Sequence, residues 1–218
     1  MIVRMKVFQD LLDRLLTAPG EAPGGALATR SDSTKPAHSA TRTAGKPTLA
    51  GGNAPPVSTA APQTVFLLPD VSQSMDEGKL RQARDGGLSF AQDAVRKGYQ
   101  VGVIQFTSWA RVRTNPTKKL AAIRAGLSEP LVQATTNMGA AIELATRELK
   151  HAKGTSAMVL VTDGYPDSSA SALAAANEAK QRDITIIAIG TDDADRDFLK
   201  QLATASELAT TVPDKDLG

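Results

Sequence analysis

The sequence predicts a doubly wound, Rossmann-like α/β domain with a mainly parallel sheet, one antiparallel edge strand and helices on both faces. Two features of residues 63–218 lead to this prediction. Short apolar runs alternate with amphipathic stretches of roughly ten to twenty residues, which is the pattern of parallel strands joined by crossover helices. In one place two strand-like segments are separated by only a short turn, which indicates an antiparallel hairpin at a sheet edge.

Four expected strands are unbroken apolar runs, and two further strands are shorter and more polar. They cover 64–68 (TVFLL), 100–106 (QVGVIQF), 157–161 (AMVLV), 184–189 (ITIIAI), 110–113 and 208–212. The expected helices have apolar side chains at helical spacing. They cover 76–97, 117–127, 138–151, 170–182 and 194–206. Gly98 follows the first helix as a terminator.

Residues 1–16 predict a separate amphipathic helix. Its apolar side chains fall on one broad face: Ile2, Met5, Phe8, Leu11, Leu12, Leu15 and Leu16. Asp10, Asp13 and Arg14 interrupt the apolar run, which argues against a signal peptide and against a transmembrane span. We therefore expect a cytoplasmic protein without a transmembrane segment.

Residues 17–62 predict a disordered linker. They hold seven of the 12 prolines and six of the 17 glycines, and their large aliphatic residues are limited to Leu27, Leu49 and Val57. Such a composition cannot bury enough apolar surface to offset the entropy of ordering. As a flexible coil, the linker would hold its ends roughly 40 Å apart on average.

A short helix on such a tether is expected to dock outside its own domain. The favoured interpretation is a docking peptide for a partner groove or for the wall of a larger assembly. A helix on a membrane surface, an organellar import sequence and a start-site artefact are the alternatives. The polar face is not strongly basic, which disfavours the membrane surface, and Asp10 and Asp13 disfavour an import sequence.

The composition excludes several kinds of site. Aromatic residues make up 4% of the chain and the formal net charge is +2, which disfavours nucleic-acid grooves and other polyanion partners. There is no cysteine, and the two histidines are His38 and His151. Thiolate and His-rich metal sites are therefore excluded, together with most His-based acid–base catalysis.

Oxygen-bearing side chains gather where the predicted strands end, which is where doubly wound sheets bind ligands. Asp70, Ser72 and Ser74 alternate after the first strand, so an extended stretch presents all three oxygens on one side. Thr136 opens a helix, and Asp163 follows the strand at 157–161. Hard oxygen donors with few carboxylates suit Mg²⁺, or Mn²⁺, in a shell completed by water.

These residues resemble the metal-ion-dependent adhesion site of a von Willebrand factor type A domain, and the resemblance covers residues 63–218. The strings VSQSM, TTNMGAAI and VLVTDG are typical of bacterial members. The resemblance implies that Ser72, Ser74 and Thr136 bind the metal through their hydroxyls. It also implies that Asp70 and Asp163 hold metal-bound waters, or bind directly in one state. An Asp or Glu side chain of a protein partner would then complete the shell.

The sequence departs from this pattern at two positions. Gln73 stands where glycine is usual, and Pro69 stands where another residue is usual. Gln73, Trp109 and Tyr165 are candidate partner-binding residues, because all three are expected on the rim that carries the metal. The alternatives are that Trp109 caps the edge of the core and that Tyr165 packs on the helix after it.

Several acidic residues have a simpler interpretation as helix caps. Asp192, Asp193, Asp195 and Asp197 are expected to be N-cap and first-turn residues of the last helix rather than a second cation site. Asp167 is expected to cap the helix after Tyr165. Capping is also the alternative interpretation of Asp70, Ser72 and Ser74.

The favoured function is a metal-dependent protein–protein adaptor, tethered to an assembly by residues 1–16. The alternative is an auxiliary subunit of an AAA+ machine of the MoxR or chelatase type, since similar domains partner such ATPases. We expect no enzyme activity and no catalytic residues, because metal phosphohydrolases need more carboxylates and a general base.

Overall fold

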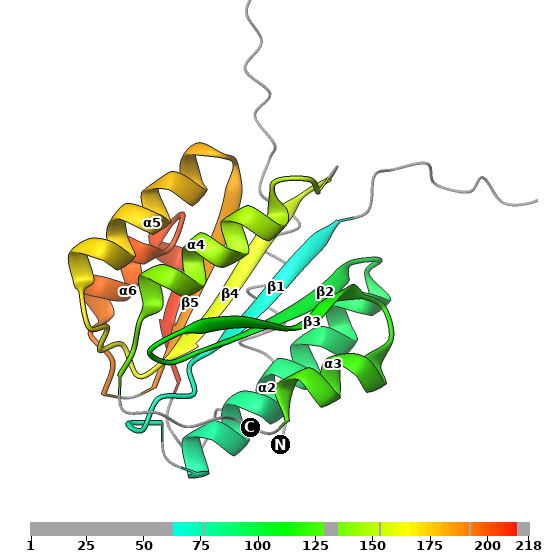
Figure 1. Ribbon diagram of the computed structural model, residues 1–218, viewed down its shortest axis with the longest axis horizontal. Coiled ribbons are helices and arrows are strands. Elements are labelled where there is room, and N and C mark those ends of the chain that lie inside the picture. The colour runs from blue at the N-terminus through cyan, green and yellow to red at the C-terminus, as the bar shows by residue number, and fades with distance from the viewer. Residues whose placement is uncertain (1–62, 76, 129–134, 153, 192, 213–218) are drawn as a thin grey trace, which may run out of the picture. The chain divides into compact units, whose positions relative to one another are not determined.

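The computed structural model describes residues 63–75, 77–128, 135–152, 154–191 and 193–212. They form a six-stranded sheet with the order β3-β2-β1-β4-β5-β6, in which only the β2–β3 pair is antiparallel (Figure 1). The strands are β1 (Thr64–Pro69), β2 (Gln100–Phe106), β3 (Ala110–Thr117), β4 (Ser156–Thr162), β5 (Ile184–Gly190) and β6 (Ala209–Thr211). The predicted fold class is confirmed, including the antiparallel strand at one edge.

Strand burial follows from composition. All residues of β1 are buried, and partial exposure in β4 and β5 is limited to Ser156 and Thr185. These are the apolar runs, and the strand order places them between the shorter or more polar β3 and β6. Strands that are apolar on both faces need helices on both faces, which explains the layered arrangement.

The helices lie on two sides of the sheet (Figure 1). One side carries α2 (Glu77–Arg96) and α3 (Leu120–Leu127), and the other carries α4 (Met138–Leu149), α5 (Ser169–Gln181) and α6 (Arg196–Leu202). Both α3 and α4 pack on β2 and β3, from opposite sides. The close approach of α4 and α5 depends on Gly139, where a methyl group would come within 2.5 Å of Ser171 Oγ.

Two predicted boundaries are wrong. The strand expected at 110–113 continues to Thr117, which pairs with Val101, so α3 begins at Leu120 rather than at residue 117. Similarly, the helix expected at 194–206 is limited to α6. Thr204 leaves the helical path because its backbone N–H donates to Ile186 O (3.1 Å) and its hydroxyl accepts from Ile186 N (2.8 Å).

The predicted docking helix at 1–16 and the predicted linker at 17–62 lie outside the described residues, as does Asp192. Within the described residues, no helix has both the length and the apolar character needed to cross a membrane.

Candidate metal centre

Asp70 lies at the carboxyl end of β1, between the ends of two neighbouring strands. Its backbone N–H donates to Val161 O of β4 (2.8 Å), and the next residue, Val71, donates to Phe106 O of β2 (2.9 Å). The side chain is fully buried. Oδ1 accepts from Ser72 N (2.9 Å), and Oδ2 accepts from the Thr162 hydroxyl (2.8 Å). Both carboxylate oxygens are therefore held by the protein.

The electrostatics of Asp70 are unusual for a carboxylic acid. Burial raises the pKa of Asp70 to about 6, while hydrogen bonds from Ser72 and Thr162 oppose this shift. The nearby charge of Asp163 raises the pKa further. Two carboxylates in a buried site repel each other, so a proton or a cation between them is stabilising.

Ser72 and Ser74 continue the loop after Asp70. Their hydroxyl oxygens lie 3.1 Å apart, and either can donate to the other. Ser72 is buried and Ser74 is exposed, so the pair leads from the interior of the site to its surface. Met75 N donates to Ser72 O (3.1 Å), which closes the turn and keeps both hydroxyls on the same side.

Thr136 is buried and lies directly before Asn137, the N-cap of α4. Residues of two other loops form hydrogen bonds with the backbone of this segment. Its N–H donates to Asp167 Oδ1 (2.9 Å), and its carbonyl accepts from Asp167 N (2.9 Å). On the other side, Thr107 O accepts from Asn137 N (2.6 Å), and the Thr107 hydroxyl donates to Thr135 O (2.9 Å). Thr107 after β2 and Asp167 before α5 thus position the Thr136 loop.

The prediction that Asp167 caps the following helix is wrong. Ser168 is the N-cap of α5 and accepts from Ser171 N (3.2 Å). A single N-cap needs one such side chain, and the sequence Asp167-Ser168-Ser169 offers three. Asp167 is consequently available to fix Thr136 and is a site residue that sequence reasoning missed.

Thr162 is a second residue that sequence reasoning missed. Its hydroxyl donates to Asp70 and accepts from Gly164 N (3.0 Å), so it connects two ligand loops. The register could have indicated this contact, because Val161 lies opposite Pro69 and the two residues that follow are Thr162 and Asp70.

Asp163 differs from Asp70 in its partners. It is 2% exposed, and its Oδ1 accepts no hydrogen bond from any residue that the structure describes. A buried carboxylate oxygen without a donor is costly, and a metal-bound water or a cation satisfies it. The described residues offer no group of three or more His, Cys, Asp or Glu side chains to a metal, so a cation here would depend on hydroxyl oxygens. The predicted set of two carboxylates and three hydroxyls fits a hard cation.

The three candidate partner-binding residues differ in exposure. Gln73 is exposed within the ligand loop. Tyr165 is 61% exposed, and its hydroxyl donates to Asp193 O (2.9 Å), which anchors an otherwise accessible ring. Trp109 is half-buried, with the Arg111 guanidinium 5.8 Å from its ring centroid. Their roles in partner binding stay predictions.

The acidic residues after β5 act mainly as expected. Asp195 is the N-cap of α6, and its Oδ1 accepts from the backbone N–H groups of Asp197 and Phe198, each at 3.0 Å. Asp197 lies in the first turn and pairs with Lys200 (3.1 Å). Asp193 instead pairs with Lys79 of α2 (3.5 Å).

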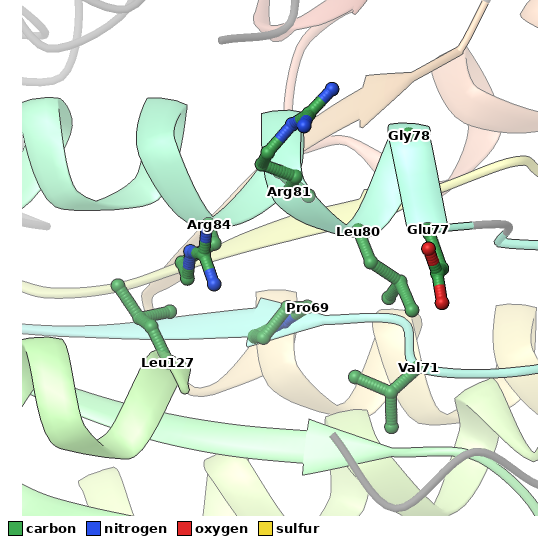
Figure 2. A pocket seen from close by; sticks show the side chains of 9 residues that line it. Pro69, Val71, Glu77, Gly78, Leu80, Arg81, Arg84 and Leu127 are labelled. Atoms are coloured by element: carbon green, nitrogen blue, oxygen red, sulfur yellow. The ribbon is translucent and has the colours of Figure 1, made fainter. Parts of the chain in front are cut away.

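A pocket of about 390 Å³ lies beside the Asp70 loop, where α2 and α3 face the end of β1. Pro69 and Leu127 form part of its apolar lining. Figure 2 shows Leu80 and Arg84 directed from α2 toward Pro69, whereas Arg81 points away. The surface next to the ligand loop is therefore partly apolar.

Solved structures with a similar fold include a pilus tip domain, a pilus adhesin and a manganese-loaded protein. The vWF domain of the type V pili tip protein Mfa5 from Porphyromonas gingivalis is 12% identical, with a TM-score of 0.65 over 72% of this chain and 92% of that chain. The pilus adhesin SpaC from Lactobacillus rhamnosus GG is 15% identical, with a TM-score of 0.62 over 73% and 29%. Manganese-loaded TRAP protein from Plasmodium vivax is 21% identical, with a TM-score of 0.56 over 65% and 62%. At these identities the likeness shows the fold alone.

Sequence comparison gives the family. No curated protein sequence matches the chain. The family model described as von Willebrand factor type A domain matches residues 64–217, which include all five predicted metal ligands. The chain therefore belongs to the von Willebrand factor type A domain family.

Proposed function

We propose that this domain binds Mg²⁺ or Mn²⁺ and captures an acidic side chain of a protein partner. Domains of this family are typically protein-interaction modules. The observation that carries the proposal is the buried Asp163 Oδ1, which accepts no hydrogen bond from the described residues and lies near the buried Asp70. A solved structure with a similar fold, TRAP protein from Plasmodium vivax, is manganese-loaded, which supports a divalent cation in this domain.

The proposed ligands divide into two groups. The hydroxyls of Ser72, Ser74 and Thr136 would contact the cation, and Asp70 and Asp163 would act through bound water. When bound, the cation supplies positive charge to a site with two buried carboxylates and offers an exchangeable position to an external carboxylate.

The surrounding residues hold the ligands in place. The Thr162 hydroxyl and the Ser72 N–H orient the Asp70 carboxylate, while Asp167 and Thr107 fix the Thr136 loop. Such outer contacts preserve the geometry of a metal site when the metal leaves. Ser74 and Gln73 are exposed, so a partner carboxylate would approach along this loop.

We propose binding rather than catalysis. The predicted ligand set contains two carboxylates and three hydroxyls, whereas metal hydrolases use more carboxylates, often a second metal, and a general base. Docking of residues 1–16 on a separate assembly stays a sequence-based prediction.

The first test measures Mn²⁺ binding by water-proton relaxation and Mg²⁺ binding by thermal shift. At a free Mg²⁺ concentration ten times Kd, ligand binding stabilises the fold by about 1.4 kcal/mol, which corresponds to roughly 3–6 °C in Tm. Asp163→Ala and the double variant Ser72→Ala/Ser74→Ala should lose both signals and remain folded. The matched control is Ser206→Ala, at an exposed serine preceding β6.

The outcome can contradict the proposal in two ways. Equal Mn²⁺ relaxation in the wild type and Asp163→Ala would place the cation elsewhere. Metal binding without any metal-dependent affinity for glutamate-containing peptides would remove the partner carboxylate from the mechanism.

A further inference from the structure

One face of β4 and β5 is buried although α2 and α3, the described helices on that side, pack mainly on β1, β2 and β3. Side chains alternate between the two faces of a strand, so Ala157, Val159 and Val161 share a face with Ile187 and Ile189 of the neighbouring strand. Each of these five side chains is at most 2% exposed. They are named the apolar strip below.

The register assigns the apolar strip to the side that carries α2 and α3. Val159 lies opposite Leu67 of β1, and Leu67 approaches Gly87 of α2, where a methyl group would lie 3.7 Å from its Cδ1 atom. However, α2 packs on β1 and β2, and α3 packs on β2 and β3.

The remaining described α-helices belong to the opposite side. Gly190 alternates with Ile189 and therefore faces away from the strip, and a methyl group there would lie 2.5 Å from Leu199 Cδ1 of α6. Neighbouring α5 packs on α6 and on α4. Figure 1 shows these three helices together across the sheet from α2 and α3.

Segments outside the described residues are candidates to cover the strip. They are 1–62, 129–134 and 213–218, together with three isolated positions. Residues 213–218 (PDKDLG) contain one large aliphatic side chain. Residues 129–134 connect α3 to α4, which both pack on β2 and β3 in the other half of the sheet.

Residues 1–16 fit the strip best in composition and length. They contain seven large apolar side chains on one helical face, whereas residues 17–62 have three large aliphatic residues in total. A 16-residue helix is about 24 Å long. The seven-residue strands β4 and β5 are each about 23 Å long, so one helix could cover the strip from end to end.

We propose that residues 1–16 form an amphipathic helix that packs its apolar face on the apolar strip of the same chain. Residues 17–62 are then the connection that allows this segment to return to the sheet. The docked helix is an intramolecular part of the domain core, and its release would expose Val159 and Ile187. This inference concerns the sheet and is independent of the proposed metal function.

A matched pair of substitutions in the full chain tests the contact. Leu12→Asp places a charge on the apolar face, and Arg14→Asp places the same side chain on the polar face. Leu12→Asp should lower Tm by roughly 5–10 °C, whereas Arg14→Asp should change it by less than about 2 °C. Equal Tm values for the two variants would overturn the proposal. The proposal would also be overturned if the wild-type segment bound a vesicle or a partner while Leu12→Asp left Tm unchanged.

A paramagnetic label tests the location without disturbing the packing. The chain has no cysteine, so Asp10→Cys provides a single attachment site on the polar face. The label should broaden the methyl signals of Ile187 and Ile189 and leave that of Ile142, in α4, sharp. Unaffected strip methyls would overturn the proposal. So would broadening in a mixture of spin-labelled chains and isotope-labelled chains, because this would place the helix on a second copy.

Discussion

The rim that carries Asp70 and Asp163 and the apolar strip on β4 and β5 are both buried, but they are incomplete in different ways. On the rim, a carboxylate oxygen of Asp163 lacks a donor among the described residues. On the strip, apolar side chains are buried although the described helices of that side, α2 and α3, pack mainly on β1, β2 and β3. A charge can complete the rim, whereas the strip needs apolar surface, so the two regions should respond to different perturbations.

Substitutions in the strip are expected to change the free energy of unfolding most. Substitutions on the rim are expected to change how this free energy depends on pH and metal. Removal of apolar contacts from a covered strip is costly at any pH. A change of charge on the rim, in contrast, acts only where a buried carboxylate gains or loses a proton or a cation.

The largest effect is expected at the centre of the strip. Ile187→Ala should lower the free energy of unfolding by about 3 kcal/mol, because it leaves a cavity in a covered core. The same-face control is Thr185→Ala, at a partly exposed position, with an expected cost of less than about 1 kcal/mol. Urea denaturation measures both. A small cost at Ile187, comparable to that at Thr185, would mean that the strip is open to solvent.

The next effect is a pH dependence that belongs to the rim alone. Burial raises the pKa of Asp70 from 3.8 to about 6, so the folded state binds more protons than the unfolded state between these values. The contribution of Asp70 to stability is therefore fully present below about pH 4 and is lost as pH rises through 6. Since one pKa unit corresponds to about 1.4 kcal/mol, the loss is about 3 kcal/mol at most.

Asp70→Asn isolates this contribution. In metal-free buffer, the wild type should lose stability relative to Asp70→Asn as pH rises from 4 to 7, because only the wild type loses the proton of Asp70. Saturating Mg²⁺ should diminish the change, because a cation favours the ionised carboxylate. A difference that is constant with pH would mean that Asp70 has an ordinary pKa.

The sequence predicted the central parts of both regions for clear reasons. The strands of the strip are unbroken apolar runs, and Asp70, Ser72, Ser74, Thr136 and Asp163 follow predicted strands or open a predicted helix. Boundaries were harder where a long-range contact decides them. Thr117 is a strand residue because it pairs with Val101, and α6 is short because Thr204 bonds to Ile186.

The residues that support the rim were not predictable in the same way. Thr162 and Asp167 act on partners 92 and 31 positions away in the chain, so no local pattern indicates their roles. A Thr at a strand end and an Asp before a helix both have common local explanations. The role of Thr162 follows only from the strand register, which places it beside Asp70. The role of Asp167 follows only from Ser168 being the N-cap of α5, which leaves Asp167 to bond Thr136.

The smallest effect is expected at Asp167, which supports the Thr136 loop on the rim. Asp167→Ala removes the acceptor for Thr136 N and should weaken Mg²⁺ binding about tenfold, because the ligand loop loses its support. The cost in unfolding free energy should be about 1 kcal/mol, since one partly buried hydrogen bond is lost. Asp167→Asn retains an acceptor oxygen and should recover most of the affinity, as measured by competition with Mn²⁺. If Asn and Ala weaken binding equally, the charge of Asp167 matters rather than its hydrogen bond, and the rim depends on the sum of its carboxylates.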